Sequence, residues 1–200
     1  MQLTGKQIVE QGIIDNYCEK GVQQQGLDVR LTKVRKMKQK HLTAKAQHFD
    51  MVNDVMVNDA VYIVDWDKCG KIPRHSKTVL PEMTEWMQPE KITRDGEEIE
   101  VFRLTPGYYE IEFFESCKIP RDKVLNYKTR SSLVRCGVHV FSGQFDGGFE
   151  TRNMGAYLLV LNPIEIEYMA RVAQAVVTES YPVTDEYLYN GQWQNDKQRK

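Results

Sequence analysis

The sequence predicts an all-β protein, built as an antiparallel sandwich or as a barrel of the jelly-roll type. Several short segments, such as residues 26–31 and 108–114, alternate between apolar and polar side chains, which is typical of half-buried strands. From residue 106 onward, turn signals separate such segments at a spacing of about ten residues, and this regular spacing favours a sandwich or barrel.

The first hundred residues contain one expected helix and few clear strands. Thr4 is a candidate N-cap and Gly12 a stop signal for a helix between them. A basic segment, residues 33–45, has no interleaved aromatic side chains, so we expect a solvated face or loop there. Residues 61–64 are a strand candidate, and Asp95-Gly96 predicts a hairpin turn ahead of a strand at residues 99–104.

The second half of the chain is richer in strand signals. Besides 108–114, the expected strands lie at residues 138–141, 156–162, 164–168 and 170–177, and the continuous apolar run of 156–162 predicts burial on both faces. Beyond residue 178 aliphatic side chains become few while aromatic ones persist. We therefore expect one β domain at residues 1–180, followed by a C-terminal arm at residues 181–200.

Composition excludes several classes of function. The net charge of −1 gives no overall field that would attract nucleic acid or an acidic membrane. No apolar run approaches 18 residues, and the N-terminal residues lack the apolar stretch of a signal peptide, so we expect a cytoplasmic protein without nucleic-acid or membrane partners. The four cysteines are scattered without a CxxC pair, which argues against zinc and redox chemistry.

The stretch from residue 129 to 150 combines groups suited to phosphate chemistry. Arg130 offers a planar fork of donors, and Ser131 and Ser132 add neutral donors beside it. Asp146 precedes two glycines that allow a tight turn. A carboxylate near a phosphate-binding loop is what hydrolysis of a phosphoanhydride by an activated water requires.

These elements, in their order, resemble the trimeric dUTPase and dCTP deaminase superfamily. Five segments carry the resemblance: Gly26-Leu27-Asp28-Val29-Arg30-Leu31, Arg130-Ser131-Ser132-Leu133-Val134-Arg135, Phe145-Asp146-Gly147-Gly148-Phe149, Ala170-Arg171-Val172-Ala173-Gln174 and Tyr189-Asn190-Gly191-Gln192-Trp193-Gln194. The resemblance implies a distorted antiparallel jelly roll of the β-clip type, a homotrimer with active sites between subunits, and a deoxynucleoside triphosphate substrate that carries Mg²⁺ on its phosphates.

The resemblance also bears on which reaction is catalysed. Deaminases of this superfamily use a glutamate on the strand that follows the hairpin at residues 145–149. The two possible alignments place Leu159 or Val160 at the position of that glutamate. An aliphatic side chain cannot act as a general acid or base. We therefore expect hydrolysis of dUTP to dUMP and pyrophosphate rather than deamination, with Glu150 as the fallback acid because residues 151–154 look like an insertion.

The resemblance assigns a role to each candidate site residue, and each has a structural alternative. Asp146 is the expected general base, or else a turn aspartate that bonds its own backbone. We expect Arg130, Ser131 and Ser132 to contact the phosphates, with a plain turn as the alternative for the two serines. Arg135 is expected to pair with a phosphate or with Asp146, or else to form an interface salt bridge. Gln174 is expected to contact a phosphate or the base edge, or else to be a satisfied strand residue. Phe149 is expected to pack on the deoxyribose or in the core, and Asp28 to hold waters of the metal shell or a structural arginine.

The base and the arm complete the expected site. The uracil is expected to be bound mainly by hairpin backbone near Gln144 and Gly147. Tyr189 and Trp193 are expected to form a lid that stacks on the base from a neighbouring subunit, unless the tail is disordered. Two other functions stay open: a dCTP deaminase or bifunctional deaminase–dUTPase, which Arg135 and the tail favour, and a nucleotide-binding regulatory protein on the same fold.

Overall fold

The computed structural model describes residues 1–38, 49–50, 55–56, 83–189 and 194. The chain divides into two units, residues 1–36 with 85–200, and residues 37–84. In the second unit, β4 (Phe49–Asp50) pairs with β5 (Val55–Met56). The strand expected at residues 61–64 and the lid residue Trp193 lie outside the described residues. The expected boundary at residue 180 stays a prediction.

The first unit is built around one antiparallel sheet that confirms the predicted all-β class. Its strands follow the order β10-β15-β3-β8-β13-β11, and a short strand, β2, pairs with β3. The bounds are β2 (Val22–Gln23), β3 (Gly26–Lys36), β8 (Gly107–Phe113), β10 (Lys123–Thr129), β11 (Val138–Phe141), β13 (Gly155–Val160) and β15 (Arg171–Glu179).

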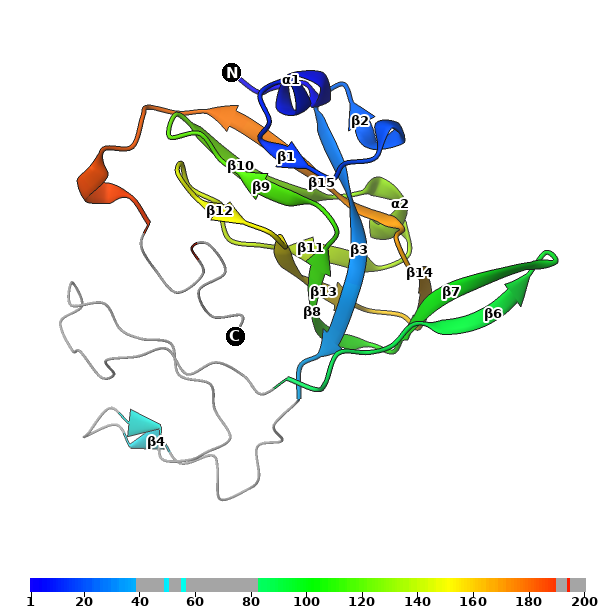
Figure 1. The fold of residues 1–200 in the computed structure, drawn as a ribbon. Helices are drawn as coiled ribbons and strands as arrows, with labels where there is room; N and C mark the ends of the chain where they lie inside the picture. Colours follow the sequence, from blue (N-terminus) through cyan, green and yellow to red (C-terminus); the bar gives the residue numbers. More distant parts are fainter. Residues whose placement is uncertain (39–48, 51–54, 57–82, 190–193, 195–200) are drawn as a thin grey trace. The chain divides into compact units, whose positions relative to one another are not determined.

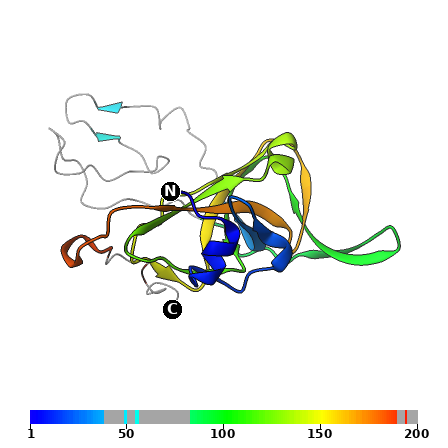
Figure 2. The same ribbon diagram turned by 90° about the horizontal axis from the view of Figure 1, so that it is seen from above.

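The two end strands of this sheet, β10 and β11, come together and nearly close it into a barrel (Figure 2). The Val140 N–H donates to the Thr129 hydroxyl at 2.8 Å, which joins the end of β10 to β11. Farther along, Leu125 and Phe145 exchange two backbone hydrogen bonds of 2.9 Å each. These contacts satisfy polar groups that an open sheet edge would leave unpaired.

Alternation along the strands fills the barrel with aliphatic and aromatic side chains. In β13 every second residue is buried, and the same alternation holds at Tyr109 and Ile111 of β8 and at Lys123 and Leu125 of β10. The largest fully buried side chains include Tyr109, Phe102, Phe113, Ile111, Leu31, Leu125 and Met154. The apolar run predicted at 156–162 therefore faces the core on one side only, because Tyr157 and Leu159 point to the other side.

Two smaller sheets flank the barrel. One consists of β1 (Ile14–Asp15), β9 (Ser116–Lys118) and β12 (Glu150–Thr151). The other consists of β14 (Ile164–Glu167), β7 (Glu97–Leu104) and β6 (Glu90–Arg94), and its β6–β7 hairpin projects from the body (Figure 1). The hairpin turn at Asp95-Gly96 is confirmed, with φ of 53° and 85°.

Helices are few and short in the described part of the chain. The predicted N-terminal helix is confirmed as α1 (Gly5–Glu10), with Thr4 and Gln7 forming a capping box. The others are α2 (Ser131–Arg135) and the 3₁₀ turns η1 (Glu19–Gly21) and η3 (Asp185–Tyr187). None of these described helices has the length and apolar character needed to cross a membrane.

Residues 33–45 were expected to form a solvated face or a loop, and the first part of this segment is a strand face rather than a loop. Strand β3 continues to Lys36, and its cations pair across to acids on β8. Lys33 lies 2.9 Å from Glu112, and Arg35 lies 2.7 Å from Glu110. The charges that suggested a loop are therefore cross-strand pairs, which stabilise a sheet.

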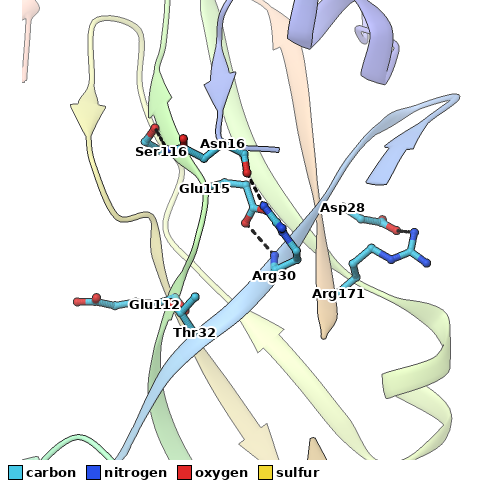
Figure 3. A network of polar contacts seen from close by, with 8 residues as sticks. All are labelled: Asn16, Asp28, Arg30, Thr32, Glu112, Glu115, Ser116 and Arg171. Atoms are coloured by element: carbon cyan, nitrogen blue, oxygen red, sulfur yellow. Dashed lines mark hydrogen bonds and ion pairs between the residues drawn. The ribbon is translucent and has the colours of Figure 1, made fainter. Parts of the chain in front are cut away.

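A buried ion pair anchors β3 to the segment between β8 and β9. Glu115 is fully buried, and its carboxylate accepts the Arg30 backbone N–H at 2.8 Å and the Arg30 Nε–H at 2.6 Å. The guanidinium also donates to the Asn16 carbonyl (Figure 3). It lies over the Phe114 ring as well. A carboxylate buried this deeply is tolerated because Arg30 donates a hydrogen bond to each of its two oxygens and neutralises its charge.

Removal of the Glu115 charge should destabilise the fold strongly. We expect Glu115→Gln to lower the free energy of unfolding by about 3–5 kcal/mol, because it leaves the partly buried Arg30 uncompensated. Urea unfolding measures this. As a control, Glu98→Gln breaks an exposed pair with Lys91 and should cost less than about 1 kcal/mol. Equal losses for the two variants would contradict the anchoring role of Glu115.

Candidate functional site

Arg130, Ser131 and Ser132 lie where β10 ends and α2 begins. The Arg130 N–H donates to the Val172 carbonyl on β15 at 3.3 Å, which continues the β10–β15 pairing by one residue. Ser131 and Ser132 are exposed on the first turn of α2, and Arg135 is exposed on the last turn. Arg130, Ser131 and Ser132, three of the five residues predicted to bind phosphate, therefore lie at one accessible corner of the barrel.

Asp28 lies beneath this corner and holds two arginines. Only 3% of its surface is exposed, and one of its oxygens, Oδ2, lies 3.3 Å from Arg130 Nε and 3.3 Å from an Arg171 guanidinium nitrogen. Burial raises the pKa of the Asp28 carboxyl, while Arg130 and Arg171 act to lower it. Of the two roles expected for Asp28, these contacts support the one of holding an arginine.

Gln174 lies next to Asp28 on the same side of the sheet. It is directly opposite Asp28 on β3 and directly opposite Lys128 on β10, so the three side chains share one face. Its side chain covers Gly26, where an added Cβ would stand 2.4 Å from the Ala175 carbonyl oxygen. Gly26 therefore cannot be replaced without moving β15 or the Gln174 side chain, which lies opposite Asp28.

Asp146 occupies a tight turn between β11 and β12. Its side chain is exposed and accepts a hydrogen bond of 2.9 Å from the amide of Gln144, while its carbonyl accepts the Phe149 N–H at 3.1 Å. A Cβ on Gly147 would stand 2.4 Å from the Arg121 carbonyl oxygen. Gly147 thus brings the turn close to the β9–β10 connection and leaves the Asp146 carboxylate open to solvent.

Within one chain, Asp146 and the Arg130 corner lie at opposite ends of β10. Asp146 follows Phe145, which is bonded to Leu125 near the start of β10, whereas Arg130 follows the last residue of that strand. Five residues of extended chain span roughly 16 Å. Figure 1 correspondingly shows β12 and α2 far apart. A single chain therefore does not bring the predicted base to the predicted phosphate-binding groups.

A chain of aromatic rings connects the barrel core with the C-terminal arm. It runs from Phe113 through Tyr127, Phe145 and Phe149 to Tyr189, with ring centroids 4.9, 5.5, 5.3 and 5.8 Å apart in turn. Phe149 is only 9% exposed as a result. The structure therefore places Phe149 in the core, with Tyr189 of the same chain against it.

The arm also bonds to the hairpin through polar groups. The Gln194 carboxamide donates to the Gly148 carbonyl at 2.9 Å and accepts the Glu150 N–H at 3.2 Å. Asp185 pairs with Arg121 at 2.6 Å. Sequence reasoning placed Gln194 in the tail motif but gave it no partner, because the motif carries no information about which backbone groups the amide contacts.

The strand after the hairpin presents no acid at the position that a deaminase would need. Val160 is buried opposite Val138, and Leu159 lies opposite His139. The fallback acid Glu150 is exposed on β12, with its carboxylate 3.8 Å from Lys118. Neither alignment of this strand thus supplies a proton-transfer group in β13.

Comparison with known proteins identifies the family. Residues 2–180 match the model of the family described as dCTP deaminase-like. The chain belongs to this dCTP deaminase-like family. A protein of Methanocaldococcus jannaschii, named deoxyuridine 5′-triphosphate nucleotidohydrolase, is 29% identical over 180 residues, which span 88% of this chain and 92% of the relative.

Two further proteins are also similar to this chain, one over a shorter stretch and the other at lower sequence identity. A probable deoxyuridine 5′-triphosphate nucleotidohydrolase of Methanococcoides burtonii is 30% identical over 95 residues, 46% of this chain and 55% of the relative. The crystal structure of a 2′-deoxycytidine 5′-triphosphate deaminase from Agrobacterium tumefaciens superposes with a TM-score of 0.51 and 14% identity, covering 88% of this chain and 47% of that one. This last likeness supports the fold alone.

The contact between arm and hairpin can be measured directly. We expect Gln194→Ala to accelerate hydrogen exchange of the Glu150 amide about fivefold, because a net hydrogen bond contributes about 1 kcal/mol. Exchange followed by NMR provides the measurement, with the Leu125 amide inside the barrel seam as an internal control that should not change. Unaltered exchange at Glu150 would show that the arm does not rest on the hairpin.

Proposed function

We propose that this protein is a dUTPase, which hydrolyses dUTP to dUMP and pyrophosphate. The observation that carries the proposal is the Methanocaldococcus jannaschii relative, whose name is that of a dUTP nucleotidohydrolase and of which this chain covers 92%. The absence of a carboxylate at Leu159 and Val160 supports hydrolysis over deamination. Arg130, Ser131, Ser132, Gln174 and the accessible Asp146 provide groups suited to that chemistry.

Asp146 would act as the general base. Its carboxylate accepts a proton from a water while the water oxygen forms a bond to the α-phosphorus, and the bond from that phosphorus to the bridging oxygen breaks in line. Pyrophosphate leaves with the electron pair of the broken bond. The hydrogen bond from Gln144 fixes one Asp146 oxygen and leaves the other for the water.

The phosphates would be bound by the donors at the β10–α2 corner. Arg130 supplies charge-assisted bonds, and the exposed hydroxyls of Ser131 and Ser132 supply neutral ones. Arg135 and Gln174 flank this corner and would contact the outer phosphates. Tyr189 and Trp193 of the arm would close over the base, whose edge is bound by backbone near Gln144 and Gly147.

Mg²⁺ fits this site as a substrate-bound ion. The described residues contain no cluster of three His, Cys, Asp or Glu side chains that could hold a metal, and Asp28 already faces two cations. The hard oxygens of a triphosphate are the natural ligands of Mg²⁺, which would neutralise part of their charge. Mg²⁺ would therefore reach the site bound to the substrate phosphates.

The separation of Asp146 from Arg130 along β10 supports an active site shared between copies of the chain. A closed homo-oligomer, a trimer by the family resemblance, would place the hairpin of one subunit against the β10–α2 corner of the next. Each subunit would then contribute the base to one site and the phosphate-binding groups to another.

Two other functions are alternatives, and a specific observation favours the first of them. Deamination of dCTP is favoured by Arg135 and by the arm, which here contacts the hairpin. Release of ammonia from dCTP would establish it. A regulatory nucleotide-binding role would be favoured by dUTP binding without pyrophosphate release.

Replacement of the base should abolish turnover without unfolding the protein. We expect Asp146→Asn to lower the rate of pyrophosphate release from Mg²⁺-dUTP by about 10²–10⁴-fold, the usual contribution of a positioned base. Asp95→Asn, at the tip of the β6–β7 hairpin, is the matched control and should retain full activity, because Asn tolerates the same positive φ. Normal turnover by Asp146→Asn would refute the role of Asp146.

Complementation tests whether the active site is shared. Asp146→Asn and Arg130→Gln chains with different affinity tags, each inactive alone, are co-expressed and the mixed oligomers purified. If sites lie between neighbouring subunits of a trimeric ring, one of the three sites in each mixed trimer receives both native groups, and activity returns to about one third of the wild-type level. Mixed oligomers that are no more active than their parents would mean that each site is built within one chain.

A further inference from the structure

Arg171 is the cation at the β10–α2 corner to which no function has been assigned. It opens β15, and its guanidinium donates to Asp28 Oδ2 at 3.3 Å and to the Lys20 carbonyl. Its side chain is 31% exposed, almost the same as the 33% of Arg130. The two side chains are therefore exposed to the same extent, and they share a single carboxylate oxygen.

The charge balance at this corner is positive. Asp28 supplies one carboxylate against Arg130 and Arg171, and the exposed Lys128 lies two residues from Arg130 on the same side of β10. Cations held near one another at a partly exposed surface attract a multiply charged anion. Two arginine side chains on a surface repel each other and would move apart. A fixed negative charge between them, here that of Asp28, is needed to keep both at the corner.

The backbone helps to hold the arrangement. One Arg130 guanidinium nitrogen donates to the Arg171 carbonyl at 3.2 Å, and the β3–β15 register shifts between Arg171 and Ala173. A bulge of this kind turns a side chain away from the direction that regular alternation would give it. The Arg171 side chain thereby reaches the buried Asp28 (Figure 3) instead of following the alternation of β15.

We propose that Asp28 gathers Arg130 and Arg171 into a two-arginine site that binds the polyphosphate of the nucleotide. Arg171 is the second phosphate-binding cation, and Asp28 is a positioning residue that touches the arginines but not the substrate. This inference rests on the proposed function in its choice of ligand. It extends that function by adding one binding residue and by assigning the buried aspartate to the arginines.

The test uses full-length protein and two probes, inorganic tripolyphosphate and the non-hydrolysable analogue α,β-imido-dUTP, both with Mg²⁺, in calorimetric titrations at several salt concentrations. We expect Arg171→Gln to weaken the binding of both probes by about tenfold or more and to flatten the salt dependence, since one charge-assisted contact is lost. Arg171→Lys, which keeps the charge, should recover part of the affinity.

Arg35→Gln is the matched control. Arg35 is also 31% exposed and also pairs with a carboxylate, but it lies toward the other end of β3. The Arg35 variant loses the same overall charge, so an equal loss of affinity in both variants would show that net charge, and not the corner, binds the anion. Unchanged affinity and salt dependence in Arg171→Gln would overturn the role of Arg171.

Asp28→Asn tests positioning by the sign of its effect. Removal of a negative charge alone should tighten anion binding, whereas loss of the group that holds both arginines should weaken it. We expect binding of tripolyphosphate to weaken several-fold in the folded variant, as judged by its circular dichroism. Tighter binding would overturn the positioning role.

The outcomes separate this inference from the proposed function. Tripolyphosphate that binds through Arg171 to a wild-type protein unable to hydrolyse dUTP would leave the two-arginine site standing and remove the dUTPase proposal. Hydrolysis of dUTP with normal binding by Arg171→Gln would do the reverse.

Discussion

The position of β10 in the barrel governs how this protein can act. One end of the strand is tied to the hairpin through the Leu125–Phe145 pair, and the other end carries Thr129 and Arg130, which join β11 and β15. Because an extended strand cannot shorten, the carboxylate of Asp146 and the guanidinium of Arg130 are kept apart by its length. The same seam that closes the barrel therefore prevents one chain from completing the proposed site.

Two buried carboxylates, Glu115 and Asp28, form ion pairs with arginines at strand β3. The two ion pairs differ in what they contribute to the protein. Glu115 holds Arg30 with short, direct bonds and a backbone contact, so that pair is saturated and serves the fold. Asp28 faces two arginines at 3.3 Å, and burial still outweighs both in raising its pKa. A buried ion pair is by itself weak evidence for stability. The contacts of Asp28 with both arginines agree with the positioning role proposed above.

Much of the fold follows from local sequence signals. Thr4, Asp95-Gly96 and the alternation in residues 108–114 each specify a cap, a turn or a strand through their own backbone preferences. The extension of β3 to Lys36 does not follow, since its charges become favourable only when Glu110 and Glu112 lie opposite them. Register is a long-range property, and a basic run by itself carries no information about the acids it will face.

The residues of the candidate site also divide into those that local sequence signals identify and those that depend on long-range contacts. Arg130, Ser131, Ser132 and Asp146 could be named from adjacent residue types, because the chemistry is local to each motif. Arg171 could not be given a role in this way, since its partner Asp28 is 143 positions away and is reached only through a bulge. The sequence shows only a further arginine at the start of a strand. A role for this arginine can be inferred only once its contact with Asp28 is known.

The arm adds a constraint that concerns the sugar of the nucleotide. Phe149 was expected either in the core or against the deoxyribose, and here the Phe145 and Tyr189 rings contact it. A sugar that packs on the ring face contacted by Tyr189 must displace that side chain, whose arm is also held by Gln194. If the deoxyribose binds at Phe149 as proposed, nucleotide entry requires release of the arm from its own hairpin. In the proposed homo-oligomer, the arm of a neighbouring subunit would then close over the base only after the resident arm has moved.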